Sequence, residues 1–349
     1  MKLKHFTSRA LVCLLALWML LMLAACGSAP AEKAAEAPAP APAETVAAVE
    51  ETAVEETASD VSYTYDEYAL ERNGIALHLD RIAVEGTEPA DNILLVHGLT
   101  YSSHEFDIDY QDYSLVRFLA RNGYAVWRID IAGYGQSGAV EDGFMPNSDY
   151  AAEDINAAVN LITEETGMDK IDMLGWSWGT VTSSRFAAAY PEHLDKLVLY
   201  APILCGLGAA EITDAFHYNT WEHAADDFQK TESGDFDYSI TDPVVVSLYC
   251  SSCWLYDDDS SPNGGRRDLC VDASQQLIDL TAIQSPTLVI CGDRDPYLNY
   301  DLVNPCLDSL PEGSELKVVP GAAHAMLLEK PYYQEFQNAV IDYLMAEAQ

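Results

Sequence analysis

The feature of the sequence that most clearly predicts chemistry is a serine, Ser177. Residues 175–179 read Gly-Trp-Ser-Trp-Gly, the pattern G-x-S-x-G. They follow the apolar run 171–174, which predicts a strand, and precede the stretch 180–190, which predicts a helix. The two glycines permit a tight elbow that lifts the serine hydroxyl above the sheet and aims the backbone N–H of Trp178 at a developing oxyanion. Ser177 is therefore predicted to be a nucleophile, with Trp178 as one oxyanion-hole donor.

A serine hydroxyl is a poor nucleophile by itself, so Ser177 needs a general base and an acid that orients this base. These partners must come from other parts of the chain. Their positions therefore depend on the elements that surround the serine.

The pattern of apolar residues predicts an alternation of strands and helices after residue 61. Short apolar runs, typical of strands buried on both faces, cover residues 93–96, 125–129, 171–174, 197–200, 287–290 and 316–319. Helical spacing covers residues 114–122, 150–166, 180–190 and a C-terminal helix after Pro331. Such alternation predicts parallel pairing with right-handed crossovers. Before it, Asn73-Gly74 predicts a β-hairpin between residues 63–71 and 75–84.

These elements and the serine motif resemble the α/β-hydrolase superfamily over about residues 61–349, apart from one insertion. The resemblance implies an α/β fold with a mostly parallel central sheet flanked by helices and an inserted cap domain. It also implies that the catalytic residues follow in the order Ser, Asp, His. Residues 291–296, Cys-Gly-Asp-Arg-Asp-Pro, look like the family's G-x-x-D turn. That likeness makes Asp295 the acid, with Asp293 as its rival.

The same resemblance identifies a base. Residues 321–325 read Gly-Ala-Ala-His-Ala and are followed by Glu-Lys-Pro at 329–331. This is similar to the family's G-x-G-H…E-x-P segment, with Ala323 in place of the second glycine. His324 is then the residue that takes the proton from Ser177 and later gives it to the leaving group.

Two further segments resemble the family and predict supporting roles. Residues 97–100, His-Gly-Leu-Thr, look like the H-G-x oxyanion loop, which makes the backbone N–H of Leu99 the second oxyanion-hole donor. His97 itself is expected to tie this loop down, because His324 already fills the role of base. Residues 130–137 resemble the D-x-x-G-x-G-x-S segment, with Ala132 where arginine is frequent, and their role is predicted to be architectural.

Residues 206–282 interrupt the alternation, and their position matches the cap of many α/β-hydrolases. Asp257-Asp258-Asp259 lacks the Gly and Glu of an EF-hand calcium loop, so a solvated acidic loop is predicted there. Aromatic side chains in the cap could line the substrate pocket or build an ordinary cap core; they are Phe216, Trp221, Tyr249, Trp254 and Tyr256. Trp176 and Trp178, beside the nucleophile, could wall an apolar pocket, or one of them could pack under the sheet.

Six cysteines follow residue 26, an even number that favours disulfides in an exported protein. Cys250, Cys253 and Cys270 lack a fourth ligand at zinc-site spacing, so no metal site is predicted. Disulfides that pin the cap are expected, with free thiols in an anaerobic host as the alternative. The six residues are Cys205, Cys250, Cys253, Cys270, Cys291 and Cys306.

The N-terminus predicts export and lipid anchoring. Residues 1–25 combine Lys2, Lys4 and Arg9 with an uncharged apolar run, as in a signal peptide. The run ends in Leu-Ala-Ala-Cys-Gly, which resembles the bacterial lipobox and predicts cleavage before Cys26 and acylation of its thiol. An ordinary signal peptide and an uncleaved anchor are the alternatives. Residues 26–60, rich in Ala, Pro and Glu, predict a disordered linker. The hydrolase domain, 61–349, would then lie on the outer face of a bacterial membrane.

The charge excludes a nucleic-acid partner. Without residues 1–25 the chain has 15 basic and 56 acidic residues, a net charge of −41. Phosphate backbones are bound by clustered Lys and Arg, which this chain lacks. No cofactor is predicted either, since the serine mechanism needs none.

The leading functional prediction is hydrolysis of a carboxylic ester with a small or medium apolar acyl group. The first alternative is a serine aminopeptidase resembling proline iminopeptidases, in which acidic cap residues would hold the ammonium of a short peptide. A second alternative is a non-catalytic surface binding protein on a hydrolase scaffold. The resemblance does not choose between ester and amide, because one fold serves many reactions.

Overall fold

The computed structural model describes residues 61–346. The predicted signal peptide, Cys26 and the linker 26–60 lie outside these residues. The strands are β1 Tyr63–Arg72, β2 Ile75–Val84, β3 Asp91–Val96, β4 Tyr124–Ile129, β5 Ile171–Trp176, β6 Leu194–Tyr200, β7 Phe216–Tyr218, β8 Ser260–Pro262, β9 Thr287–Gly292 and β10 Glu315–Val319. The helices are α2 Leu115–Arg121, α3 Ser148–Thr166, α4 Trp178–Ala189, α5 Trp221–Ala224, α6 Pro243–Tyr256, α7 Gly264–Leu269, α8 Tyr300–Val303 and α9 Tyr332–Met345, together with short 3₁₀ turns. No helix among the described residues is both long and apolar enough to span a membrane.

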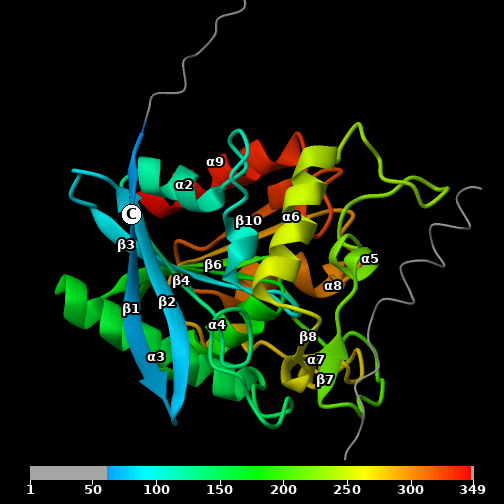
Figure 1. The fold of residues 1–349 in the computed structure, drawn as a ribbon, viewed down its shortest axis with the longest axis horizontal. Helices are drawn as coiled ribbons and strands as arrows, with labels where there is room; N and C mark the ends of the chain where they lie inside the picture. The colour runs from blue at the N-terminus through cyan, green and yellow to red at the C-terminus, as the bar shows by residue number, and fades with distance from the viewer. Residues whose placement is uncertain (1–60, 347–349) are drawn as a thin grey trace, which may run out of the picture. The chain divides into compact units, whose positions relative to one another are not determined.

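The central sheet has eight strands in the order β1-β2-β4-β3-β5-β6-β9-β10 (Figure 1). The β1–β2 and β2–β4 pairs are antiparallel, and every other pair is parallel. The predicted hairpin is present: Asn73 and Gly74 turn between β1 and β2 with φ angles of 55° and 80°, as the tightest hairpins require. The fold is that of the α/β-hydrolases, as predicted.

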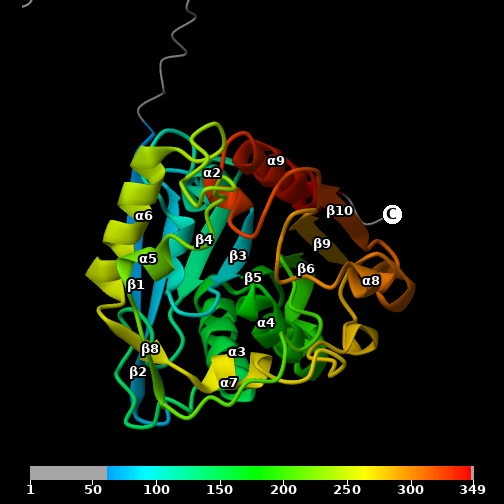
Figure 2. The same cartoon turned by 90° about the vertical axis from the view of Figure 1, so that its right-hand side faces the viewer.

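Helices cover both faces of the sheet. Along β3, Leu94 joins the hydrophobic cluster of α3 and α4, whereas Leu95 joins the cluster of α2 and α9. This alternation follows from the two-residue period of a strand, and it explains why the predicted strands are apolar throughout. Figure 2 shows α2 and α9 on one side of the sheet and α3 and α4 on the other. The sheet is therefore rigidly sandwiched, and its strand ends hold a fixed geometry.

The predicted helices are present with small shifts at their ends. The helix α3 begins at Ser148, two residues earlier than predicted, because the side chain of Asn147 accepts a hydrogen bond from the N–H of Tyr150 and caps the helix there. Gly167 ends it in the left-handed conformation. The helix α4 begins directly at Trp178, so the serine motif lies at the strand–helix junction itself.

The insertion 206–282 carries α5, α6, α7 and the β7–β8 ribbon, which lie toward the viewer in Figure 2. Its aromatic residues do not form one lining. Tyr249 is buried in the core of the cap, whereas the other four are more than one-third exposed: Phe216, Trp221, Trp254 and Tyr256. Of the two alternatives, the structure supports a cap core for Tyr249, and the other four side chains are partly exposed to solvent.

The prediction of a solvated acidic loop at residues 257–259 is wrong for one of its residues. Asp258 and Asp259 are exposed, but Asp257 is only 7% exposed. Its carboxylate accepts hydrogen bonds from the imidazole Nε2 of His104 at 2.6 Å and from the backbone N–H of Ser102 and Gly135. These donors compensate for its burial.

The expectation of disulfides is also wrong: all six cysteines in the described residues are free. Cys250 and Cys253 lie three residues apart on α6 and point into the apolar core of the cap. Burial raises the pKa of the Cys250 thiol to about 11. Both residues therefore serve as small apolar side chains, which is the common role of buried cysteine.

Candidate active site

Ser177 lies at a strained turn between β5 and α4. Its φ and ψ angles are 56° and −120°, a conformation that is rare for residues other than glycine. A Cβ atom on Gly175 would lie 2.3 Å from the carbonyl oxygen of Gly179, and one on Gly179 would lie 2.4 Å from that of Val96. Only glycine fits at these two positions, so the motif is required by the close approach of strand, helix and neighbouring loop.

The structure brings His324 and Asp295 together, although 29 residues separate them. The Nδ1 atom of His324 lies 2.7 Å from Oδ2 of Asp295, and both residues are 3% exposed. The other carboxylate oxygen of Asp295 accepts the N–H of Tyr297 at 2.9 Å. Asp293 instead accepts the backbone N–H of Gly321. The geometry thus favours Asp295 over its rival as the partner of the histidine.

The charge of Asp295 controls the protonation of His324. Burial by itself would lower the pKa of His324, but the nearby Asp295 carboxylate and its hydrogen bond outweigh burial, and Asp227 adds to their effect. The net result is a pKa above the ordinary 6.5 of histidine. A histidine of this kind is a stronger base than usual and accepts a proton readily.

Tyr200, at the end of β6, ties the serine and histidine segments together. Its carbonyl oxygen accepts the N–H of Ser177 at 3.0 Å, and its hydroxyl donates to the carbonyl oxygen of His324 at 2.5 Å. Its ring stacks on that of Trp176. No hydrogen bond joins the Ser177 hydroxyl to the His324 imidazole within residues 61–346, and such contacts often form only when substrate is bound. The sequence analysis missed Tyr200, which appears there as one residue of an apolar run.

The loop after β3 lies directly over the serine. A Cβ atom on Gly98 would lie 3.2 Å from Cβ of Ser177. His97 is fully buried, accepts the N–H of Ile131 at Nε2, and contacts the carbonyl oxygen of Gly98 through Nδ1. These contacts give His97 the predicted structural role. Burial also lowers its pKa, so it stays neutral.

A buried glutamate orients the oxyanion loop. The Oε1 atom of Glu105 accepts the backbone N–H of Gly98 at 2.9 Å, so this N–H is not available to a substrate. The next N–H along the chain is that of Leu99, whose side chain is half-buried. Burial raises the pKa of Glu105 well above its ordinary value. Glu105 was not found by sequence reasoning, since nothing in its local pattern marks it.

Contacts in the protein core hold the side chain of Trp178 in place. Its side chain is fully buried, and its indole N–H donates to the hydroxyl of Ser148 at 2.9 Å. The side chain therefore belongs to the core between α3 and α4, not to the wall of a pocket. Its backbone N–H begins α4, next to Ser177, where a helix N-terminus favours negative charge.

Tyr297, on the loop after β9, links His324 to the cap. The phenol of Tyr297 packs edge-on against His324 with ring centroids 4.7 Å apart. Its hydroxyl donates to the carboxylate of Asp227, a half-buried cap residue, at 3.2 Å. Glu329 of the E-x-P segment accepts the backbone N–H of Gln229 in the same part of the cap. The cap is thus joined to the loop that carries His324.

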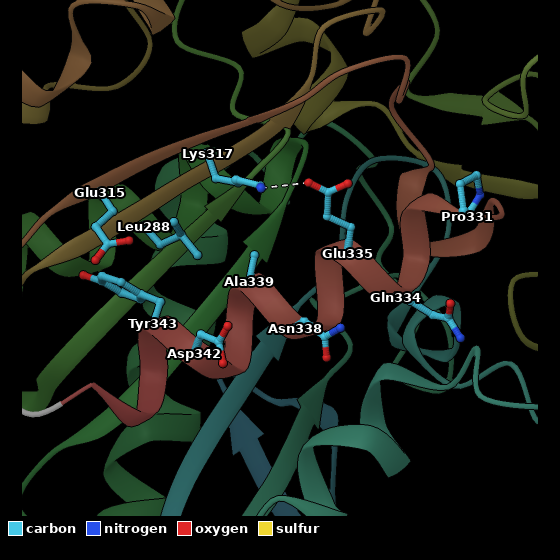
Figure 3. A pocket seen from close by; sticks show the side chains of 10 residues that line it. All are labelled: Leu288, Glu315, Lys317, Pro331, Gln334, Glu335, Asn338, Ala339, Asp342 and Tyr343. Carbon is cyan, nitrogen blue, oxygen red and sulfur yellow. Dashed lines mark ion pairs between the residues drawn. The ribbon is translucent and has the colours of Figure 1, made fainter.

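Other features of the described residues do not bear on this chemistry. No group of three His, Cys, Asp or Glu side chains in residues 61–346 is arranged to hold a metal ion. A hollow of about 650 Å³ lies along α9 and β10, where Lys317 pairs with Glu335 at 2.7 Å. Figure 3 shows the side chains that line this hollow. Its lining includes Leu288 and Glu315 near the amino ends of their strands. Ser177 lies at the carboxyl end of β5, where ligands bind in α/β sheets.

Comparison with known proteins places the chain in a hydrolase family. A family model described as "Serine aminopeptidase, S33" matches residues 87–331. The poly(3-hydroxyalkanoate) polymerase subunit PhaC of Haloferax mediterranei is 24% identical, over 76% of this chain and 61% of its own length. This chain therefore spans about three-fifths of that relative. The uncharacterized carboxylesterase nap of Bacillus subtilis is 21% identical, over 72% of this chain and 79% of its own length.

Solved structures give the same fold. The carboxylesterase CesB (YbfK) from Bacillus subtilis superposes with a TM-score of 0.55 at 17% identity, covering 82% of this chain and 93% of that protein. At this identity the likeness establishes the architecture and leaves the substrate open.

Proposed function

The chain belongs to the family described as serine aminopeptidase S33 and is an α/β-hydrolase. Within this fold, which serves both ester and amide hydrolysis, we propose that it cleaves a carboxylic ester. The acyl group is small or medium in size, the sequence predicts it to be apolar, and it forms an acyl-enzyme on Ser177. The observation that carries the proposal is the buried His324–Asp295 pair beside a strained serine elbow. The carboxylesterase name of a relative supports an ester as substrate.

In the proposed mechanism, Nε2 of His324 takes the proton of the Ser177 hydroxyl as Oγ bonds to the ester carbonyl carbon. The carbonyl oxygen becomes an oxyanion, which the backbone N–H groups of Leu99 and Trp178 stabilise by roughly 3–4 kcal/mol each. The C–O bond to the alcohol then breaks, and His324 gives its proton to the departing alkoxide. Asp295 holds the imidazole in orientation and stabilises its charged form.

The second half of the proposed mechanism repeats these steps with water. His324 takes a proton from water, and the oxygen bonds to the acyl carbon. The bond to Oγ breaks, Ser177 recovers its proton from His324, and a carboxylic acid leaves. The chemistry uses only side chains and backbone groups of this chain and water.

The test is covalent labelling. A fluorophosphonate probe is expected to label the wild-type protein, and Ser177→Ala is expected to abolish labelling while the far-UV circular dichroism stays unchanged. A wild type that the probe leaves unlabelled would instead favour the non-catalytic binding protein.

A serine aminopeptidase is the second candidate, and one observation favours it. The carboxylate of Asp227 lies close enough to His324 to raise its pKa, in the part of the cap that adjoins the pair. It could hold the ammonium group of a peptide N-terminus. Proline and alanine arylamides compared with p-nitrophenyl esters decide between the candidates: faster amide hydrolysis, with a KM raised by Asp227→Asn, would support the peptidase.

We also propose that the protein is exported and lipid-anchored at Cys26, on a linker of residues 26–60, to the outer face of a bacterial membrane. The support is the sequence of the N-terminus alone. Labelled palmitate is expected to be incorporated into the wild type and not into Cys26→Ala. Incorporation that survives this substitution would remove the proposal.

A further inference from the structure

The cap contains three basic residues, and one of them differs from the others in its surroundings. Lys230 pairs with Asp226 at 2.8 Å on the surface. Arg267 is exposed, and its guanidinium lies over the ring of Phe144, 4.4 Å from the centroid. Arg266, its neighbour on α7, is half-buried and turns inward, where its Nη2 atom donates to the hydroxyl of Thr100 at 2.7 Å. Arg266 therefore reaches the oxyanion loop.

Gly265, the residue before Arg266 on α7, also packs closely against this part of the protein. A Cβ atom on Gly265 would lie 2.5 Å from the indole of Trp178 and 2.8 Å from the side chain of Leu99. The residue before Arg266 thus packs directly on both predicted oxyanion-hole residues. The guanidinium is held beside the loop that covers Ser177.

No carboxylate pairs with the guanidinium of Arg266 within residues 61–346. Its Nη1 atom is buried without a hydrogen-bond partner, and none of the ion pairs in residues 61–346 includes this residue. Other buried or half-buried arginines are paired: Arg72 with Asp154, and Arg128 with Asp80. In a chain with 56 acidic residues, an inward arginine without a carboxylate is conspicuous. A buried charge that lacks a partner is costly.

The groups around Arg266 are neutral. Burial and the charge of Arg266 lower the pKa of His217 to about 4, and they also lower the pKa of His223. The rings of these histidines lie 4.7 Å apart, and Nε2 of His217 is likewise buried without a partner. The hydroxyl of Tyr101 lies 3.3 Å from Nδ1 of His223. Arg266 thus lies among polar, uncharged groups, and the N–H groups on its Nη1 atom have no acceptor.

We propose that Arg266 binds an anionic group of the substrate, a carboxylate attached to the ester beyond the bond that is cleaved. A carboxylate would take the free Nη1 and share the guanidinium with Thr100, which is the fork geometry that arginine favours. This inference rests on the proposed ester hydrolysis and narrows its substrate to carboxylate-bearing esters. The carboxylate can belong to the acyl part or to the alcohol part.

The experiment compares esters that differ only in this charge. For the acyl part, monomethyl glutarate is compared with methyl valerate, and for the alcohol part, 4-acetoxybenzoate with 4-methylphenyl acetate. The wild type is expected to prefer the anionic member in at least one pair. Arg266→Gln is expected to reduce that preference, as a ratio of kcat/KM values, roughly tenfold or more. The pair of esters for which the ratio falls shows whether the acyl part or the alcohol part of the substrate carries the carboxylate.

Arg267→Gln is the matched control, because it removes the same charge one residue away on the exposed side. It is expected to keep the wild-type ratio, and Arg266→Lys is expected to keep part of it. A ratio that is equal in wild type and Arg266→Gln in both pairs would overturn the inference. So would an equal loss of activity toward neutral and anionic esters, which would indicate a structural role.

If Arg266→Gln does not fold, an inhibition experiment on the wild-type protein tests the inference instead. Glutarate is then expected to inhibit the hydrolysis of 4-methylphenyl acetate competitively and at least tenfold more strongly than the neutral glutaramide; equal inhibition overturns the inference. The failure of the proposed function is separate. It would show as no ester hydrolysis and no fluorophosphonate labelling in the wild type.

Discussion

The surroundings of Ser177, His324 and Asp295 fit the catalytic roles proposed for them. The serine is held at a positive φ by the glycines on both sides of the elbow. The histidine is buried, yet it is a better base than in water, because the charge of Asp295 outweighs burial. For His97, burial outweighs the nearby charge of Asp130 and lowers the pKa. The pKa values of these two buried histidines thus shift in opposite directions, according to the balance between burial and neighbouring charge.

Replacement of Asp295 tests this account through the pH dependence of activity. His324 must be neutral to act as base, so activity is lost as the pH falls through its raised pKa. Asp295→Asn removes the charge that raises this pKa, so the acidic limb of the kcat/KM profile is expected to move to lower pH. Because the imidazole also loses its orientation, kcat is expected to fall by roughly 10⁴-fold.

The matched control is Asp293→Asn, since Asp293 bonds Gly321 and not the histidine. It is expected to leave the acidic limb where it is. An acidic limb that moves in Asp293→Asn and not in Asp295→Asn would reverse the assignment of the acid.

At the scale of elements, the cap and the oxyanion loop are joined by buried polar contacts. Asp257 ends α6 and accepts hydrogen bonds from His104, Ser102 and Gly135, which lie on the loops after β3 and β4. From the same 3₁₀ turn as His104, Glu105 holds the N–H of Gly98. A movement of α6 would therefore be transmitted to the loop that is predicted to supply an oxyanion-hole donor.

Asp257→Ala is expected to lower both stability and kcat. It leaves the imidazole of His104 and two backbone N–H groups buried without an acceptor, which costs roughly 3–5 kcal/mol in the free energy of unfolding. The urea midpoint measures this loss, and kcat at saturating ester measures the effect on the oxyanion loop. Asp258→Ala, at the exposed neighbour, is the control and is expected to change neither. Equal midpoints for the two variants would contradict the contact.

The whole molecule contains a buried acid whose ionisation opposes folding. Asp172 on β5 accepts hydrogen bonds from the hydroxyl of Tyr124 and the N–H of Lys196, and thereby links β5 to the strand β4 and the start of β6. Burial, helped by the charge of Asp91, raises its pKa to about 7. The folded state therefore keeps the proton to a higher pH than the unfolded state.

This raised pKa predicts how stability changes with pH. Asp172 binds its proton in the folded state and releases it in the unfolded state between about pH 4 and pH 7, so its contribution to stability is lost as the pH rises through that window. Asp172→Asn does not titrate and is expected to gain stability relative to wild type over the same window. Thermal unfolding from pH 5 to pH 8 measures the difference, with exposed Asp169→Asn as control. A constant difference across the window would contradict the raised pKa.

The net charge of the whole molecule acts on the proposed substrate. With residues 1–25 removed it is −41, so an anionic ester is repelled from a distance and attracted by Arg266 only on contact. Raising the salt from about 0.01 M to about 0.15 M shortens the screening length from roughly 30 Å to roughly 8 Å. The kcat/KM for anionic esters is expected to rise severalfold, while that for neutral esters stays constant. A salt effect of equal size on both would contradict the electrostatic account.

The sequence by itself determined the strands of the central sheet, the helices that flank it and the serine elbow, but not the elements within the cap. These depend on local properties: the two-residue period of strands, the apolar spacing of helices, and the glycines at 74, 175 and 179 that a tight turn or close approach demands. The resemblance of short motifs also ordered Ser177, Asp295 and His324 along the chain, and the structure joins the last two by a hydrogen bond.

Only the tertiary structure decided which distant side chains meet. Arg266 and Thr100 are 166 residues apart in the chain, and His104 and Asp257 are 153 apart. No local period or motif marks such pairs, since each partner alone reads as a surface charge or a loop residue. Their burial and pairing arise only when the cap packs on the loops of the sheet. That packing is why Asp257 is buried with hydrogen-bond partners, why Cys250 and Cys253 lie in an apolar core, and why Arg266 reaches Thr100.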